Sequence, residues 1–468
     1  MSNSIGIVIL AAGKGTRMKT DVPKALAPCA GLPLLDYVIN ASVDFATLSN
    51  LKAEIGVVIG HKKELLQEWW KNHSLKNSIK LAVQKEQNGT ADALKACFQD
   101  LPEFWNHEYT LVACADTPLM TGIEFQSLFG YLKNNPNLVG VAATFEASIP
   151  KGYGRIAHGL NGFKIVEEKD ATDSERQITE VNSGFYILKT SHVKSVLNNI
   201  NNKNKSGEFY LTDMFQQNYD VVAAKFPSEI PFLGINTLEQ LANVDKIIRT
   251  KKIADLMKDG VRFLIPESVY IDSTVEIGSG SVIYPNCTLL GNTKIAQNVT
   301  IESQCFIKNS QISNDVEILA SSYLEEAIVF EKATIGPMAR LRPGTEIGVE
   351  AKIGNFVEIK KSKLAKGAKV SHLSYVGDAE IGEKSNIGCG FITCNYDGAN
   401  KHRTKIGANT FIGSDVQVIA PIEIGDNVFV AAGSTITKSI PDGGFGIARS
   451  QQVTKEDMAK KFLKTKKD

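Results

Sequence analysis

Membrane-spanning segments, paired cysteines and an excess of one charge are all missing from this sequence. No apolar run approaches the ~20 residues that cross a bilayer, and no basic leader precedes an apolar stretch at the N-terminus. The seven cysteines are scattered and form no CxxC pair, which indicates reduced, packed thiols rather than a disulfide framework or structural zinc. The net charge is +1, so nothing favours nucleic acid or membrane insertion. We therefore expect a cytoplasmic protein.

Tryptophan is absent from the C-terminal half, where an aliphatic residue instead recurs at every sixth position. A helix has a period of about 3.6 and an ordinary half-buried strand a period of 2, so neither produces this pattern. A period of six is typical of a parallel β-helix, whose interior is too narrow for indole. The repeat runs through Ile271, Ile277, Ile283, Leu289, Ile295, Ile301 and Ile307, then Ile335, Leu341, Ile347, Ile353 and Ile359, then Ile406, Ile412, Val418, Ile424, Val430 and Ile436.

Two further features of the repeat are the glycines that follow many of its aliphatic positions and two stretches where the six-residue period is lost. Nine repeat positions are followed at once by glycine, which we interpret as the backbone freedom needed where the coil turns. The rhythm breaks at 361–379 and 390–405. Insertions in a repeat usually form loops outside the coil, and such loops often bind ligands. The lysine-rich tail from Thr454 is expected to be solvated and disordered.

The N-terminal half alternates apolar runs of strand length with helical segments. A chain of 468 residues is longer than one hydrophobic core usually serves, so we expect more than one domain. The alternation predicts an α/β, Rossmann-like domain with a largely parallel sheet over 1–236. Apolar residues at helical spacing, with Gly260 suited to a helix end, predict a linker helix over 237–260. The β-helix and its tail then occupy 261–468.

A glycine-rich loop follows the first predicted strand. It begins at Leu10 and Ala11, contains Gly13, and is followed by the cations Arg17 and Lys24. Such a loop lets backbone N–H groups approach phosphate oxygens. The loop is neither a P-loop nor a dinucleotide fingerprint, because the residues that those motifs require are missing. A plain surface turn with solvated cations is the alternative.

With Lys24, the loop resembles the signature of nucleotide-diphospho-sugar pyrophosphorylases, and further matches follow in order. The resemblance assigns Gln84, Gly89 and Thr90 to the uracil base, and Gly154, Glu167 and Asn182 to the sugar. It assigns Asp116 and Asn236 to Mg²⁺, a hard cation that prefers oxygen ligands. Arg17 and Lys24 would stabilise the departing pyrophosphate while the sugar phosphate attacks the α-phosphorus of UTP.

Two positions depart from that family. Asp92 stands where a histidine is usual, and Ala115 stands where a glycine is usual before the metal aspartate. A carboxylate that points at a triphosphate is unfavourable, and a methyl group at 115 adds bulk near the nucleotide sugar. Both departures concern efficiency and substrate preference rather than the fold.

The C-terminal half carries its densest chemistry where the repeat is broken. Several segments there resemble the acetyltransferase half of the bacterial bifunctional N-acetylglucosamine-1-phosphate uridyltransferase and glucosamine-1-phosphate N-acetyltransferase family. They are Ala339–Gly344, Gly354–Lys361, Ser371–Asp378, Asn386–Gly388, Thr393–Gly398, Gly413–Asp415 and Ala431–Gly433. Members of that family also carry the pyrophosphorylase half, so the resemblance covers about 1–450 in the same order.

The resemblance implies a role for each matching residue. His372 would be the general base that deprotonates the 2-amino group of the sugar, which then attacks the acetyl-CoA thioester. Arg342 and Lys360 would bind the sugar phosphate, and Tyr375 and Asn386 would line the sugar pocket. The acetyl-CoA side would comprise Cys389, Asn395, Tyr396, Ser414, Ala432 and Arg449.

Three functions remain in competition. The first is a bifunctional enzyme that uses glucosamine 1-phosphate, acetyl-CoA, N-acetylglucosamine 1-phosphate, UTP and Mg²⁺, assembled as the homotrimer that the resemblance implies. The second is a sugar-1-phosphate nucleotidyltransferase whose β-helix serves only regulation or oligomerisation. The third is a non-catalytic scaffold, favoured only by Asp92 and Ala115. Residues such as His372 and Tyr375 argue against the second, because an assembly domain does not need them.

Overall fold

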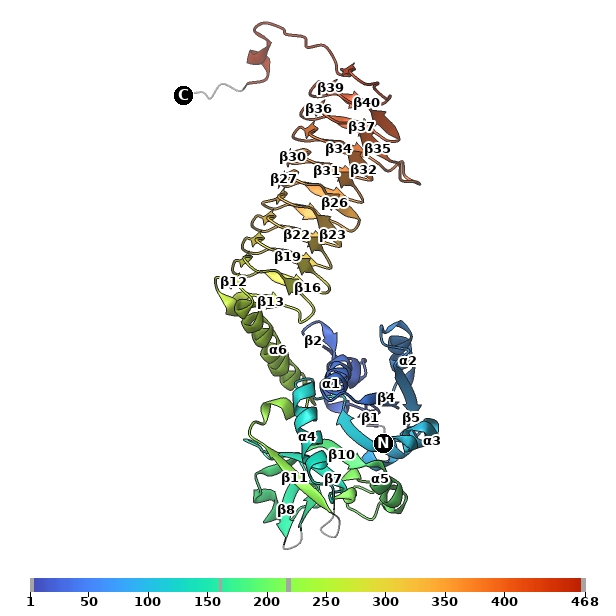
Figure 1. Ribbon diagram of the computed structural model, residues 1–468. Helices are drawn as coiled ribbons and strands as arrows, with labels where there is room; N and C mark the ends of the chain where they lie inside the picture. The colour runs from blue at the N-terminus through green and yellow to red at the C-terminus, as the bar shows by residue number, and fades with distance from the viewer. Residues whose placement is uncertain (1–3, 160–161, 216–219, 464–468) are drawn as a thin grey trace. The chain divides into compact units, whose positions relative to one another are not determined.

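The computed structural model describes residues 4–159, 162–215 and 220–463 (Figure 1). The chain forms two compact units, Met1–Ile248 and Arg249–Asp468. The division falls inside helix α6 (Leu238–Lys258), which begins and ends within two residues of the helix that the sequence predicts. No helix among the described residues has the length and apolar character needed to cross a membrane.

The first unit is built on a twisted sheet with strand order β11-β7-β10-β6-β1-β4-β5. Only β10 runs antiparallel to its neighbours on this path, which confirms the largely parallel, Rossmann-like sheet. The hairpin of β8 and β9 extends from β10. The strands are β1 (Ser4–Leu10), β4 (Lys52–Ile59), β5 (Ile79–Val83), β6 (Tyr109–Cys114), β7 (Gly140–Glu146), β8 (Arg155–Gly159), β9 (Gly162–Val166), β10 (Glu180–Lys189) and β11 (Val221–Phe226).

Helices cover both faces of this sheet, so its strands are apolar on both sides. In β1, Ile7 and Ile9 face one hydrophobic cluster, which contains Phe45, while Val8 faces another, which contains Leu94. The helices are α1 (Leu34–Leu48), α2 (Lys63–Asn72), α3 (Thr90–Asp100), α4 (Gly122–Asn134) and α5 (Thr190–Val196). The loops at the carboxyl ends of β1 and β6 therefore emerge at one edge of a rigid scaffold.

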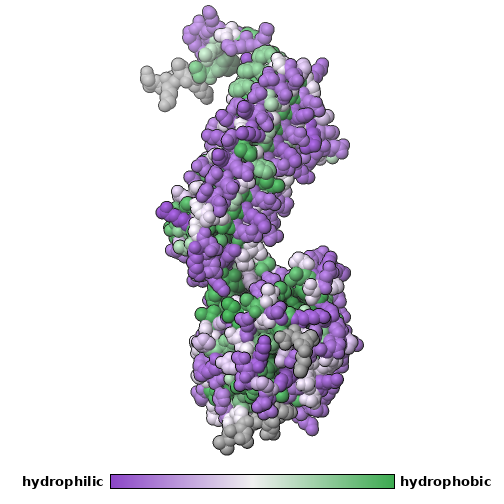
Figure 2. Space-filling model, in the orientation of Figure 1, coloured by the Kyte–Doolittle hydropathy of each residue, from purple (hydrophilic) through white to green (hydrophobic). Residues whose placement is uncertain are grey.

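The second unit is a parallel β-helix with three walls (Figure 1). The first wall runs from β12 (Arg262–Phe263) to β41 (Phe445–Gly446), the second from β13 (Tyr270–Ile271) to β40 (Thr435–Ile436), and the third from β14 (Glu276–Ile277) to β38 (Ile422–Ile424). The repeat aliphatics stack inside as one continuous core. Outside, much of the surface is hydrophilic in the view of Figure 2.

The first predicted interruption does not leave the coil. Residues 361–379 contain β29 (Lys363–Leu364), β30 (Lys369–His372) and β31 (Tyr375–Gly377), which continue the three walls. A coil here has 17 residues, since Lys352 pairs with Lys369, whereas an earlier coil has 18, since Tyr270 pairs with Thr288. In one wall of this coil the repeat has five residues instead of six. The aliphatic positions that follow therefore shift by one residue, although no residues are inserted.

The second interruption does leave the coil. It lies between β34 (Ile392–Cys394) and β35 (Thr404–Ile406), and Ala379 pairs with Thr404, 25 residues later. The extra residues form a loop over 395–403, closed by a bridge between Tyr396 and Lys401. This part of the prediction is confirmed.

We predicted that glycine follows nine repeat positions because the coil turns there, and this explanation is mostly wrong. Of those nine positions only Gly336 has a positive φ. The others lie where the next coil passes very close: a Cβ atom on Gly382 would lie 2.3 Å from the carbonyl carbon of Gly407. Other residues take the left-handed conformation at the corners, for example Asn298 and Asn409. Glycine is thus required by close packing of backbones, not by the turn.

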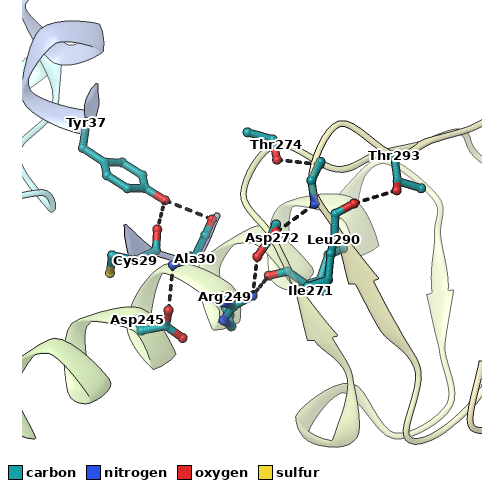
Figure 3. Close-up of polar contacts among 11 residues, drawn as sticks. Cys29, Ala30, Tyr37, Asp245, Arg249, Ile271, Asp272, Thr274, Leu290 and Thr293 are labelled. Carbon is teal, nitrogen blue, oxygen red and sulfur yellow. Dashed lines mark hydrogen bonds and ion pairs between the residues drawn. The ribbon is translucent and has the colours of Figure 1, made fainter. Parts of the chain in front are cut away.

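Two residues in the middle of helix α6, one turn apart, make polar contacts (Figure 3). Within the first unit, the carboxylate of Asp245 accepts a hydrogen bond of 2.6 Å from the backbone N–H of Ala30. Within the second unit, Arg249 donates to the carbonyl of Ile271 and to the carboxylate of Asp272. The guanidinium of Arg249 also lies 3.5 Å from the ring centroid of Tyr270, so it caps the first coil.

The tail follows the last coil. Residues 454–463 are exposed except for the half-buried Met458, in keeping with a solvated segment. They include a short 3₁₀ helix at Met458–Lys461, so this stretch is not without structure. The rest of the predicted tail, 464–468, lies outside the described residues.

Candidate active sites

A cavity of about 280 Å³ lies in the first unit at the carboxyl ends of β1 and β6. Gly15 has a φ of +57°, and a Cβ atom there would lie 2.9 Å from the Cβ of Lys24, so only glycine lets the loop pass this lysine. The lining residues are Leu10, Ala11, Ala12, Gly13, Lys24, Ala25, Gln84, Gln87, Gly89, Thr90, Ala93, Cys114, Ala115, Asp116 and Glu208. Most residues predicted for the nucleotide therefore share one cavity.

Four predicted residues meet at one end of this cavity. The Nζ atom of Lys24 contacts the carboxylate of Asp116 and lies 2.8 Å from the Oδ1 of Asn236. Arg17 donates to the same Oδ1 atom at 2.8 Å. The backbone N–H of Ile235 donates to the carbonyl of Asp116, which fixes the two segments together. The side-chain oxygens of Asp116 and Asn236 thus lie around one position, and a positively charged group binds there.

Gln84, Gly89 and Thr90 lie together at another part of the cavity wall. Gln84 is buried, and its Nε2 donates to the carbonyl of Gly89 at 3.0 Å and to the carboxylate of Asp92 at 2.8 Å. A Cβ atom on Gly89 would lie 2.4 Å from the carbonyl oxygen of Phe209, so glycine is needed here. The carboxylate of Asp92 is therefore held against Gln84, and not against the phosphate loop.

The predicted sugar residues form a third group. Asn182 donates its backbone N–H to the carbonyl of Gly154, and a Cβ atom on Gly154 would lie 3.6 Å from a carboxylate oxygen of Glu167. Burial raises the pKa of Glu167 above its ordinary value, and the hydroxyl of Thr212, which donates to it, opposes this only partly. Gly184 connects this group to the cavity through Cys114, whose thiol donates to its carbonyl.

In the β-helix, one corner carries a column of predicted residues. His372 pairs with Asn355 in the preceding coil, and strand register places Cys389, Ser414 and Ala432 at the same corner of the following coils. The column ends where Arg449 donates to the carbonyl of Ala432 at 2.8 Å. Successive coils are about 4.8 Å apart, so the column is a continuous track along the corner between the first and second walls.

His372 has a defined tautomer in this column. Its Nδ1 lies 2.9 Å from the Oδ1 of Asn355. An amide oxygen only accepts hydrogen bonds, so Nδ1 carries the proton and the lone pair of Nε2 is free to accept another. Asn355 was not among the predicted site residues, although it lies in one of the matching segments.

The corner between the second and third walls carries the predicted phosphate cations. Arg342 follows β25 (Arg340–Leu341) and Lys360 ends β28 (Glu358–Lys360). Glu358 holds the guanidinium of Arg342 at 2.8 Å. Lys401, which was not among the residues predicted from sequence, extends from the loop over 395–403. Its side-chain hydrogen-bond contact with Lys360 is the largest cause that lowers the pKa of Lys360 below its ordinary value, followed by burial and by the charge of Lys401. Three cations in one place form a site for a doubly charged anion.

The loop over 395–403 is folded around Asp397. Its carboxylate accepts hydrogen bonds from the backbone of Ala399 and Asn400 and from His402, and these contacts hold its pKa well below the usual value. Asn395 is buried and donates to the carboxylate of Asp378 at 2.6 Å. A signal for Lys401 was available: it lies in the same break of the repeat as Asn395 and Tyr396.

Tyr375 lies between the two corners. A Cβ atom on Gly377 would lie 2.5 Å from the Tyr375 hydroxyl and 2.8 Å from the Nδ2 of Asn395, so this glycine makes room for both side chains. Asn386 is the predicted residue that the fold does not bring to this face. It begins β33 (Asn386–Ile387) on the first wall, where it is paired with Lys369 and Phe411.

Comparison with known proteins covers both units. Residues 7–157 match the MobA-like NTP transferase domain family, residues 265–345 the GMPPB C-terminal domain, and residues 403–438 the bacterial transferase hexapeptide family. A solved structure of UDP-glucose pyrophosphorylase complexed with UDP-glucose is 18% identical, with a TM-score of 0.41, and covers 53% of this chain and 99% of its own.

Two relatives match almost from end to end. The bifunctional protein GlmU of Geotalea uraniireducens is 42% identical over 460 residues, covering 97% of this chain and 98% of the relative. That of Streptococcus agalactiae is 41% identical over 461 residues, covering 97% of each chain. This chain belongs to the family of bifunctional GlmU proteins. It is therefore a bifunctional enzyme, a uridyltransferase and an acetyltransferase, and its coil is a left-handed β-helix of hexapeptide repeats.

Proposed function

We propose that the β-helix acetylates glucosamine 1-phosphate with acetyl-CoA and that the first unit then couples the N-acetylglucosamine 1-phosphate to UTP. The products are CoA, UDP-N-acetylglucosamine and pyrophosphate. We take 1–236 and 261–468 as the functional domains, joined by the linker helix. The observation that carries the proposal is that one chain holds both the Lys24, Asp116 and Asn236 cluster and the His372 column, each built from residues predicted for that chemistry.

In the uridyltransferase site, the residues suit binding and charge neutralisation. Asp116 and Asn236 present two hard oxygens at one point, which fits Mg²⁺ with phosphate and water as the remaining ligands. When bound, the ion supplies charge neutralisation at the phosphates. Lys24 and Arg17 stabilise pyrophosphate as it leaves, and the loop that contains Gly13 gives backbone N–H groups to the phosphates. The group of Gly154, Glu167 and Asn182 orients the sugar phosphate for in-line attack.

In the acetyltransferase site, His372 acts as general base. Its Nε2 takes a proton from the 2-amino group, and the nitrogen attacks the thioester carbon; the C–S bond then breaks and CoA leaves as the thiol. Arg342, Lys360 and Lys401 bind the phosphate. Tyr375 and Asn386 line the sugar. Acetyl-CoA lies along the column of Cys389, Ser414, Ala432 and Arg449, with Asn395 and Tyr396 beside the thioester.

A homotrimer explains the position of Asn386. It lies on the first wall, whereas the cations lie at the corner between the second and third walls, so in a homotrimer a second copy would supply Asn386 to the cations. Cyclic assembly around parallel coils meets this need. All seven cysteines are thiols rather than halves of disulfides, which supports work in the reducing cytoplasm.

One experiment tests the proposal. The purified protein is given glucosamine 1-phosphate, acetyl-CoA, UTP and Mg²⁺, and free CoA and pyrophosphate are followed separately. We expect CoA release without UTP, and pyrophosphate release only after acetylation or when N-acetylglucosamine 1-phosphate is supplied. Pyrophosphate alone from the acetylated sugar would instead support a nucleotidyltransferase with a regulatory coil, and neither product would support a scaffold.

A further inference from the structure

The side-chain amide of Gln84 has only one possible orientation in this structure. Both hydrogens on its Nε2 are engaged, one by the carbonyl of Gly89 at 3.0 Å and one by the carboxylate of Asp92 at 2.8 Å. A carbonyl and a carboxylate only accept hydrogen bonds, so neither can face the amide oxygen. Reversing the amide would place oxygen against two oxygens. The orientation is therefore fixed by chemistry.

The amide oxygen of Gln84 is consequently the atom available to a ligand. Among the described residues no donor to Gln84 Oε1 is recorded, and this atom is not one of the buried polar atoms sealed from solvent. Gln84 lines the cavity beside Gly89 and Thr90. A single acceptor on a cavity wall requires a donor from whatever fills the cavity, because a ligand that excludes water without supplying a donor leaves a costly unmatched polar group.

We propose that Asp92 determines the nucleobase specificity of the uridyltransferase by holding Gln84 with its oxygen toward the substrate. This inference rests on the proposed function. Uracil and thymine carry an N–H at N3, which matches an acceptor. Cytosine has a lone pair at N3, so it would place two acceptors against each other. The cavity therefore selects pyrimidine nucleotides with an N3–H.

The position of Asp92 suits the orientation of Gln84 and does not suit contact with the phosphates. It lies in the first turn of α3, where a negative charge is favourable near the positive end of the helix dipole. Its carboxylate has no contact recorded with Lys24 or Arg17 in the part of the chain described by the structure. Gly89 alone would leave the amide with one hydrogen bond, about which it can turn. The second acceptor removes that freedom.

The test uses the full chain, Mg²⁺ and N-acetylglucosamine 1-phosphate, with UTP or CTP as the nucleotide and pyrophosphate as the readout. Asp92→Leu removes the acceptor at similar size, and Asp92→Asn keeps one acceptor oxygen. Asp173→Asn removes an exposed carboxylate elsewhere in the unit as a control. For Asp92→Leu we expect a higher KM for UTP, a UTP-over-CTP preference that is lower by about tenfold, and little change in kcat at saturating UTP.

Asp92→Asn should keep the preference within about twofold of the original, as a conservative rescue, since an amide oxygen still accepts from Gln84. The control should change nothing. An unchanged UTP-over-CTP ratio in Asp92→Leu would overturn the inference, as would equal losses with both nucleotides. An original protein that forms no pyrophosphate from UTP would instead overturn the proposed function, so the two failures are distinct.

Discussion

The Nζ atom of Lys24 lies 2.8 Å from the Oδ1 atom of Asn236. The same ammonium group contacts Asp116, so the two oxygens assigned to the metal are paired with a lysine. A divalent ion that binds there must share or displace this charge. The lysine is then free to pair with phosphate, which is the arrangement that a departing pyrophosphate needs.

Asp116→Asn keeps the shape of the side chain and removes its charge. We expect uridylyl transfer to fall by about 100-fold or more, because charge neutralisation at the phosphates is the main contribution of such a site. The Mg²⁺ concentration needed for half-maximal pyrophosphate release should also rise. Acetyl transfer, measured as CoA release, should stay unchanged. Glu64→Gln, at an exposed carboxylate on α2, is the matched control. Full pyrophosphate release by Asp116→Asn would remove this residue from the metal site.

His372→Ala should have the opposite effect. Loss of a general base costs about 10² to 10⁴-fold in rate, so CoA release should fall by that factor while pyrophosphate formation from N-acetylglucosamine 1-phosphate continues. Asn355→Ala should cost about tenfold in kcat, because the imidazole then loses the acceptor that fixes its tautomer. A variant of either residue that loses both activities while still folded would contradict independent sites.

Lys401 gives the phosphate site a testable pH dependence. Its side-chain hydrogen-bond contact with Lys360 is the largest cause that lowers the pKa of Lys360, so in the free enzyme Lys360 loses its proton at a lower pH than an ordinary lysine. The charged form binds phosphate and is present below that pKa. The ratio kcat/KM for glucosamine 1-phosphate should therefore fall as pH rises through the lowered pKa. In Lys401→Met the fall should move to higher pH, with weaker binding at neutral pH. An unmoved profile would show that the two lysines do not interact.

The coil could be predicted from sequence because its core has one repeating requirement. Every sixth side chain must fill the same interior, so Ile283, Ile301 and their equivalents reveal the fold directly. The five-residue repeats were misread as an insertion, since a period found by counting cannot distinguish a shortened wall from an excursion. The glycine rule failed for a related reason. The close approach of Gly382 to Gly407 is a contact between coils that are 25 residues apart, which no local pattern shows.

The candidate sites were predictable as far as residue types matched a family motif. Asp116 follows β6, and the loop that leads to Lys24 follows its parallel neighbour β1, so both lie at one edge of the sheet. Asn236 follows no neighbouring strand and is brought there by the backbone hydrogen bond from Ile235 to Asp116. Partners of the motif residues were missed, among them Asn355, Glu358 and Lys401, because their contribution depends on stacking between coils. Asp92 shows the same limit, because from sequence it was only a departure from the family. The structure shows what it contacts, and that contact is with Gln84.

The close packing of coils makes a final prediction for stability. A Cβ atom on Gly348 would lie 2.6 Å from the carbonyl oxygen of Leu364 and 2.7 Å from the carbonyl carbon of Ala365. These are backbone atoms of the next coil, which cannot move aside as a flexible side chain can. Gly348→Ala should therefore lower the free energy of unfolding of the β-helix by about 1–3 kcal/mol.

Gly130 in α4 has no atom within 4 Å of its Cβ position and serves as the control. There, alanine should stabilise the first unit by about 0.5–1 kcal/mol, because glycine weakens a helix interior. The two units are each compact, so the measurement is hydrogen exchange in urea, followed at coil amides for Gly348→Ala and at amides of the first unit for Gly130→Ala. If both alanine variants shift stability in the same direction, contact between backbones is not what places glycine after the repeat aliphatics.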